Sequence, residues 1–215
     1  MIRTLRIKFW ERTALNAFTL SKFEKAQRAF EKILQLDPDR KGVYFNRGLA
    51  LMSMQRFAEA RQSFLEESSR HGDSLPLQKA LAEAAYRMGD RIAARDHYSC
   101  AGSLTSTAKE QGFCEKRAAI CASEGQFAQA MAAQELLDQA DGLMLQKKFD
   151  HAEPLFQEAC QLDPTCFQAL NNIGAIRLSQ KDYAGAKESF LKADELVDLP
   201  MVKNNLLYLA KRGFV

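Results

Sequence analysis

The sequence lacks most features that mark a metal site or a disulfide framework. It has five cysteines, an odd number, and no two of them form a CxxC pair. The three histidines form no paired motif of the kind that binds zinc. We therefore expect no metal and no disulfide framework, and we interpret the cysteines as reduced thiols that fill small apolar sites.

Motifs of phosphate binding and catalysis are missing as well. There is no Gly-rich phosphate loop, and no GxSxG, HExxH or kinase pattern occurs. Carboxylate pairs such as Glu66 and Glu67 are expected on a polar helix face, without a partner that would tune the pKa of either one. We expect no catalytic residue and no cofactor, so the sequence favours a protein that is not an enzyme.

Charge of one sign and long hydrophobic runs are also scarce. Thirty basic and twenty-seven acidic residues are interspersed and leave a net charge of +3, too little to indicate a nucleic-acid partner. No run approaches the roughly 18 apolar residues of a membrane span. Basic residues interrupt the first twelve positions before any signal-peptide core can form. We expect a cytoplasmic protein with no membrane insertion.

The first segment admits two interpretations. Its helical pattern over about 4–20 places Leu5, Phe9 and Trp10 where they could cover the end of a hydrophobic core, and we expect them to do so. The alternative is an amphipathic membrane anchor, because four basic residues alternate with these apolar ones.

What the sequence does contain is a repeat with a period of about 34 residues. Six alanines whose numbers differ successively by 34, 34, 36, 22 and 34 set this schedule: Ala26, Ala60, Ala94, Ala130, Ala152 and Ala186. An aromatic residue stands four positions after five of them, and another stands three positions before five of them. Three columns that keep one schedule indicate a repeated pair of helices.

A two-helix unit of this length resembles the tetratricopeptide repeat (TPR) family. One copy runs through Tyr44, Gly48, Phe57, Ala60 and Phe64, and another through Leu170, Gly174, Tyr183, Ala186 and Phe190. The resemblance covers nearly the whole chain. It implies an all-α fold, a right-handed α-solenoid of about five to six helix–turn–helix repeats closed by a C-terminal capping helix.

The positions of proline and glycine, together with the hydrophobic periodicity, predict the helix boundaries. Pro38 and Pro164 end helices, Gly89 and Gly125 mark tight turns within pairs, and Gly48 and Gly174 allow close approach of two helices. The predicted helices are 4–20, 23–36, 41–54, 57–70, 75–88, 91–101, 108–123, 126–146, 149–162, 166–179, 182–196 and 199–211.

One interval, from Ala130 to Ala152, breaks the schedule, because it falls short of a full period by the length of one helix and its turn. No glycine or proline lies between Gln126 and Asp141, so we predict one continuous helix over 126–146 that serves two successive repeats. This sharing should break the inner surface into an N-terminal lobe, 1–125, and a C-terminal lobe, 126–215. The last predicted helix, 199–211, would cap the C-terminal lobe, with Met201, Leu206, Leu207 and Leu209 toward the last repeat and Asn205 toward water.

The resemblance also implies where a partner would bind. In TPR proteins partners usually lie along the concave face made by the first helix of each pair. The corresponding candidate residues are Phe18, Phe45, Asn46, Leu49, Met52, Lys79, Glu83, Tyr86, Arg87, Asn171, Asn172 and Leu178, and Asp141, Met144 and Leu145 lie on the same face. Phe45, Leu49, Met52 and Tyr86 would form an apolar strip, unless Leu49 and Met52 simply pack.

These residues favour a non-enzymatic scaffold or adaptor that binds a peptide or helix of a protein partner. Two alternatives stay open. One is a TPR chaperone or adaptor for a secretion, pilus or flagellum assembly system. The other is self-assembly into a homo-oligomer, with Trp10 and the basic first helix seated in the groove of another copy.

Overall fold

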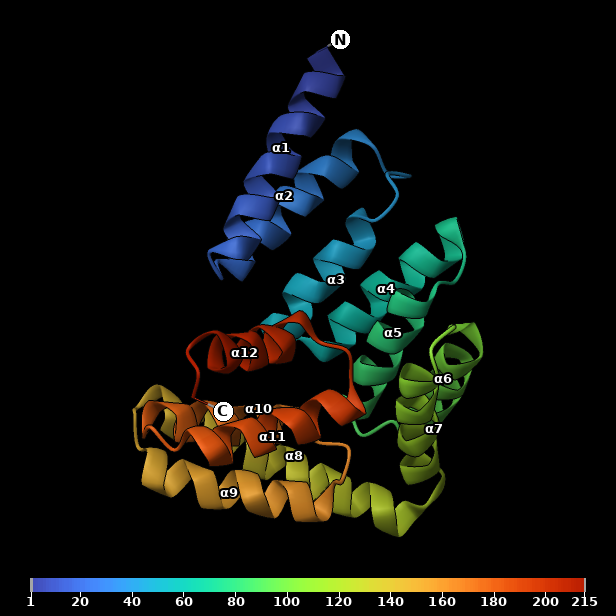
Figure 1. Cartoon of the computed structure of the whole chain (residues 1–215). Helices are drawn as coiled ribbons and strands as arrows, with labels where there is room; N and C mark the ends of the chain where they lie inside the picture. Colours follow the sequence, from blue (N-terminus) through green and yellow to red (C-terminus); the bar gives the residue numbers. More distant parts are fainter. Residues whose placement is uncertain (1, 215) are drawn as a thin grey trace. The chain divides into compact units, whose positions relative to one another are not determined.

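The computed structural model describes residues 2–214, and every regular element in that range is an α-helix (Figure 1). Each of the twelve helices lies within three residues of its predicted bounds. They are α1 (Ile2–Thr19), α2 (Phe23–Leu36), α3 (Val43–Ser53), α4 (Phe57–His71), α5 (Leu75–Arg87), α6 (Arg91–Leu104), α7 (Ala108–Ala122), α8 (Glu124–Leu145), α9 (Phe149–Leu162), α10 (Phe167–Ser179), α11 (Tyr183–Leu196) and α12 (Pro200–Lys211). The all-α prediction is confirmed.

The chain forms two compact units, Met1–Leu104 and Thr105–Val215, called here the N-terminal and C-terminal units. Helices α1 to α6 belong to the first and α7 to α12 to the second. The division falls before α7, whereas the sequence pattern suggested a lobe boundary after it, at 125/126. Helix α7 belongs to the second unit because it contacts α11 as well as α8.

Five tight turns between successive helices each contain one residue in the left-handed backbone conformation. In the N-terminal unit these residues are Ser21, Gln55 and Gly89, at equal spacing along the chain, with φ angles of 54°, 58° and 75°. In the C-terminal unit they are Lys147 and Lys181, with φ angles of 58° and 65°. The tight turn therefore repeats even where a side chain disfavours it, so the packing of the helix pair imposes it.

The repeated columns form the cores of both units. All six period-setting alanines, from Ala26 to Ala186, are buried, and so are the five aromatic residues that follow them, from Phe30 to Phe190. Gly48 lies against the ring of Phe64, and Gly174 lies against the ring of Phe190. The helices of these pairs can therefore approach closely only because a side chain is missing at the two glycines.

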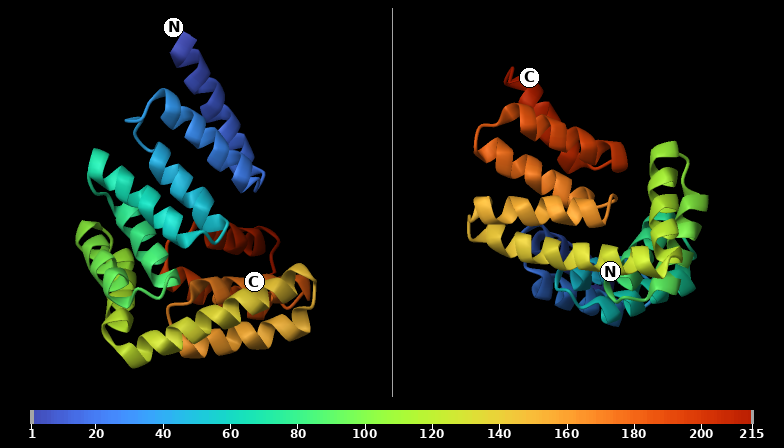
Figure 2. Two further views of the ribbon diagram at one scale, coloured as in Figure 1. Left: turned by 180° about the vertical axis from the view of Figure 1, so that it is seen from behind. Right: turned by 90° about the horizontal axis from the view of Figure 1, so that it is seen from below.

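Helix α8 is continuous over 22 residues and serves two neighbours (Figure 2). It packs against both α7 and α9, and its buried Leu137 and Ala140 share a core cluster with Phe156 of α9. The predicted turn at Gly125 is wrong. Helix α7 ends at Ala122, the hydroxyl of Ser123 accepts a hydrogen bond from the backbone N–H of Gln126, and Gly125 already lies inside α8.

Helix α12 packs against α11 at the end of the C-terminal unit. Val202 and Leu209 are buried there, and Leu206 packs beside them. Met201 and Leu207 are exposed instead of facing the last repeat as predicted, because the buried stripe runs through Val202, Leu206 and Leu209.

Candidate functional site

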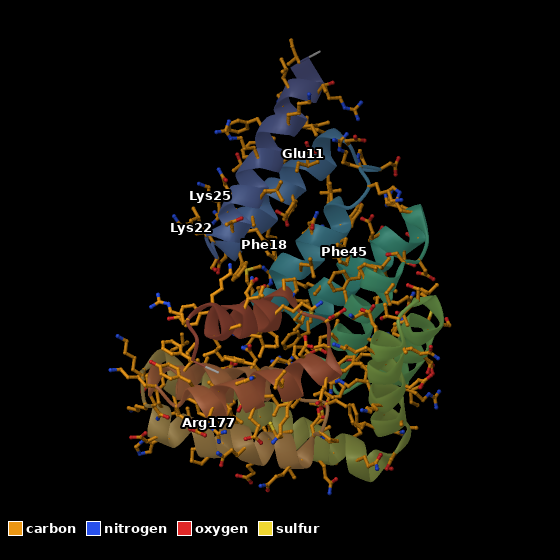
Figure 3. The ribbon with its side chains drawn as sticks, viewed as in Figure 1. Glu11, Phe18, Lys22, Lys25, Phe45 and Arg177 are labelled. Atoms are coloured by element: carbon orange, nitrogen blue, oxygen red, sulfur yellow. The ribbon has the colours of Figure 1, made fainter. Side chains whose placement is uncertain are left out.

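The candidate residues of α1 and α3 are half-buried and pack against the core of the N-terminal unit. Phe18 meets Phe23 edge-on, with ring centroids 5.4 Å apart, and Phe45 lies 5.7 Å from Phe64. Leu49 and Met52 pack against the cluster around Leu51 and Phe64. Asn46 is half-buried too. Figure 3 labels Phe18 on α1 and Phe45 on α3.

The candidate residues of α5 are engaged in contacts with other side chains. The hydroxyl of Tyr98 donates a hydrogen bond to the carboxylate of Glu83 at 3.0 Å, and the guanidinium of Arg87 lies 4.6 Å from the ring centroid of Phe57. Tyr86 is only 1% exposed, and Lys79 is half-buried. Tyr86 therefore does not extend an exposed apolar strip with Phe45, and the sequence-based expectation for it does not match the structure.

A pocket of about 260 Å³ opens beside Phe45 in the N-terminal unit. Its lining includes Glu67, whose carboxylate accepts hydrogen bonds from the backbone N–H groups of Gly42 at 2.7 Å and Phe45 at 3.3 Å. The carboxylate thus satisfies donors at the start of α3, where the helix dipole favours a negative charge. Glu67 has a structural role, and Phe45 is the one candidate residue among those that line this pocket.

In the C-terminal unit a row of polar side chains crosses three helices. The Nδ2 amide of Asn172 donates to Asp141 Oδ1 at 2.8 Å, Asn171 donates to Asn172 Oδ1 at 3.4 Å, and Asn205 donates to Asn171 Oδ1 at 3.2 Å. The row therefore joins α8, α10 and α12 by side-chain contacts. We call Asp141, Asn172, Asn171 and Asn205 the amide row.

An apolar pocket adjoins one end of the amide row. Asp141, Met144, Leu145 and Asn172 line a space of about 440 Å³, and Leu145 is 88% exposed. A fully exposed leucine beside hydrogen-bonding amides leaves both apolar and polar groups open to a ligand. Leu178, the remaining candidate on α10, is half-buried against the core of α11 and α12 and does not line this pocket.

The structure thus brings together two of the candidate asparagines, Asn171 and Asn172, with Asn205, which was expected to face water. A signal for Asn205 was present, because it follows Asn171 by one full repeat period and so occupies the same place in the next unit. The equivalence of Asn205 and Asn171 is hard to recognise, because the sequence of the capping helix departs from the repeat pattern.

Other chemistry is sparse in residues 2–214. No group of three or more His, Cys, Asp or Glu side chains that could hold a metal occurs in this range. None of its helices has the length and apolarity needed to cross a bilayer. The cysteines there are free thiols, and burial raises the pKa of Cys160 to about 11 and that of Cys166 to about 12. These thiols are protonated near neutral pH and are weak nucleophiles.

Stacked antiparallel helix pairs with small residues at their contacts define a helical-repeat protein. The sequence matches the tetratricopeptide repeat model over residues 12–73 and 137–198, which together make more than half of the chain. The chain belongs to the tetratricopeptide repeat family. This fold supports a general role as a scaffold for protein–protein interaction. The comparison with curated proteins found no match.

Solved structures share the fold at low sequence identity. MamA from Desulfovibrio magneticus RS-1, residue 41 to the end, is 12% identical with a TM-score of 0.52, covering 89% of this chain and 94% of that one. A tetratricopeptide repeat protein from Parabacteroides merdae is 17% identical with a TM-score of 0.50, and the match covers 93% of this chain and 69% of that one. A chain in the structure of the APC/C hetero-tetramer Cut9–Hcn1 is 13% identical with a TM-score of 0.51, and the match covers 93% of this chain and 42% of that one.

Proposed function

We propose that this protein is a non-enzymatic scaffold that binds an extended peptide of a partner protein across the amide row of the C-terminal unit. The observation that carries the proposal is the hydrogen-bonded series from Asp141 through Asn172 and Asn171 to Asn205. A peptide backbone has alternating donors and acceptors, and an asparagine amide offers both. Asn172 and Asn205, which are half-exposed, retain hydrogen-bonding capacity for such a backbone.

The apolar pocket supplies a second element of recognition. A side chain of the bound peptide would enter the space between Met144 and Leu145 while its backbone lies on the amides. Burying the apolar side chain gives affinity, and the fixed amide positions set the register of the peptide. The row also lies on rigid helices, so little ordering of the protein is required on binding.

Peptide selection tests the proposal. Peptides selected from a random displayed library against the full chain should lose at least about tenfold in affinity for the double variant Asn172→Ala/Asn205→Ala, since two hydrogen-bonding anchors are removed. The matched control is Asn204→Ala, an exposed neighbour on α12 outside the row. Circular dichroism should show that both variants remain folded.

Equal affinity of folded wild-type and double-variant protein for every selected peptide would place the binding surface elsewhere and reject the proposal. The apolar strip predicted from Phe45, Leu49, Met52 and Tyr86 is less suitable for such a test. Because Tyr86 is buried, Tyr86→Ala would disturb packing and could not report on binding alone.

A further inference from the structure

The outer face of α1 is apolar and uncovered. Ile2, Leu5 and Phe9 are 77%, 62% and 61% exposed, although Leu5 and Phe9 were expected to cover the core. Spacings of three and four residues place them in one stripe along the helix. The buried residues of α1, Ile7, Ala14 and Ala17, face α2 from the other side. We call Ile2, Leu5 and Phe9 the α1 stripe.

Packing of the repeat does not require the α1 stripe. The family match begins at residue 12, after the last residue of the stripe. Ile7 and Trp10 make the core contacts of this part of the helix, because Ile7 belongs to the first core cluster and Trp10 packs against that cluster. Three large apolar side chains are therefore exposed without a role in the stability of the unit, and such a surface marks an interaction site.

Unpaired positive charge borders the stripe. Arg6, Lys8 and Arg12 are exposed and form no ion pair with any described residue, whereas Arg3 lies 3.7 Å from Asp37 and Glu11 is paired with Arg40. Helix α1 holds four of the thirty basic residues and one of the twenty-seven acidic ones. The remainder of the chain then has twenty-six of each, so the whole net charge of +3 resides on α1.

The shape of the surface favours a planar partner. A shallow hollow at the stripe is lined by Ile2, Leu5, Arg6, Phe9 and Trp10, all of which belong to α1. A groove that accepts a peptide or helix needs a wall on a second element, and none of the residues lining this hollow supplies one. A single convex helix face with apolar and aromatic residues between cations suits the interface of a bilayer.

We propose that α1 is a membrane-surface helix that attaches the protein reversibly to an anionic lipid bilayer. The α1 stripe enters the boundary between headgroups and acyl chains, and Arg6, Lys8 and Arg12 contact the lipid phosphates. The attachment is peripheral. The helix belongs to the N-terminal unit, whereas the amide row belongs to the C-terminal unit.

Vesicle binding by the full chain tests this proposal, and Trp10 serves as the reporter because it is the sole tryptophan. Vesicles of phosphatidylcholine and phosphatidylglycerol at about 7:3 should bind at least about tenfold more tightly than pure phosphatidylcholine vesicles, with a blue shift of Trp10 emission. Raising the salt from about 0.05 to about 0.5 M should weaken the binding.

Matched variants separate insertion from simple charge attraction. Leu5→Ser/Phe9→Ser should reduce binding at least about tenfold, whereas Ile92→Ser, at an exposed isoleucine of α6, should leave it unchanged. Arg6→Glu/Arg12→Glu should abolish it, and Lys22→Glu/Lys25→Glu, at exposed lysines labelled in Figure 3, should weaken it far less.

Equal binding to neutral and anionic vesicles, or unchanged binding of the folded Leu5→Ser/Phe9→Ser variant, would overturn the proposal. Binding of α1 to a second copy of the chain would also overturn it. In that case light scattering would show a concentration-dependent oligomer that the Leu5→Ser/Phe9→Ser variant no longer forms, and the protein would not bind vesicles. An acidic protein bound through α1 in the absence of vesicle binding would reject it equally.

Discussion

At the residue scale, two glycines set the distance between paired helices. A Cβ atom at Gly174 would lie 2.5 Å from Cε1 of Phe190, and the equivalent clash holds for Gly48 with Phe64. Phe190 is fully buried and cannot swing away. The glycines are therefore retained in helices, where alanine would otherwise be preferred.

Gly174→Ala should lower the stability of the C-terminal unit by about 1–2 kcal/mol, since overpacking outweighs the gain in helix propensity. The control is Gly112→Ala in α7, where a Cβ meets nothing within 4 Å; there we expect a gain of about 0.5–1 kcal/mol. Urea unfolding followed by circular dichroism measures both. Stabilisation by both substitutions would contradict the close-contact argument.

The thiols provide a second prediction at this scale. With pKa values of about 11 and about 12 caused mainly by burial, Cys160 and Cys166 should be about 0.1% and about 0.01% thiolate at pH 8, against about 10% for a thiol of pKa 9.0. Both should resist iodoacetamide in the native protein and react after unfolding in urea.

Mass spectrometry of labelled peptides measures this resistance, with half-exposed Cys100 as the internal reference. Raising the pH from 8 toward 10 should accelerate labelling of Cys160 before that of Cys166, because the lower pKa yields more thiolate at a given pH. Rapid labelling of Cys166 in folded protein at pH 8 would show that its site is open to solvent.

At the element scale, α7 is tied to the corner between α9 and α10. Arg117 Nη1 lies 2.9 Å from Asp163 Oδ2, and both side chains are buried. The other oxygen of Asp163 accepts hydrogen bonds from the backbone N–H of Thr165 at 2.8 Å and from its hydroxyl at 2.6 Å. Phe113 of α7 adds an edge contact to Phe167 of α10 at 5.9 Å.

Asp163→Asn should destabilise the C-terminal unit by about 3 kcal/mol or more, because it removes the charge that compensates buried Arg117. Glu188→Gln, which breaks the exposed pair with Lys192, is the matched control and should leave the urea midpoint in place. Similar midpoints for the two variants would mean that the buried pair contributes no more than a surface pair.

At the scale of the whole molecule, these contacts bear on where the chain divides. A cut at 125/126 would separate Arg117 from Asp163 and Phe113 from Phe167, and it would also break the contact of Lys109 Nζ with Asp194 at 3.3 Å. A cut at 104/105 preserves all three. We therefore propose that residues 105–215 form the unit that folds independently.

Fragment 105–215 should unfold in one cooperative urea transition, whereas fragment 126–215 should have a lower midpoint or no cooperative transition, because it lacks the α7 contacts. Circular dichroism and tyrosine fluorescence would follow both fragments. Equal urea midpoints for the two fragments would place the boundary of the folding unit at 125/126 instead.

Much of the fold is encoded by contacts between neighbouring helices, and these are visible in the sequence. The alanine and aromatic columns recur once in each repeat because the two helices of each pair pack through the same kind of contact. That recurrence was enough to predict the helices, the buried columns from Ala26 to Phe190, and the long helix near 126–146. It also identified Asn171 and Asn172 as candidates for the inner face.

Tertiary structure decided what periodicity does not encode. Whether Tyr86 is buried, whether Leu5 and Phe9 are covered, and whether Asn205 joins the amide row all depend on which surfaces meet. The place of α7 depends on the contact between Arg117 and Asp163, which lie 46 residues apart in the chain. The sequence by itself determined the repeat and its local packing, because these arise from adjacent helices. Only the folded chain assigned the exposed surfaces and the units, because these arise from contacts outside the repeat.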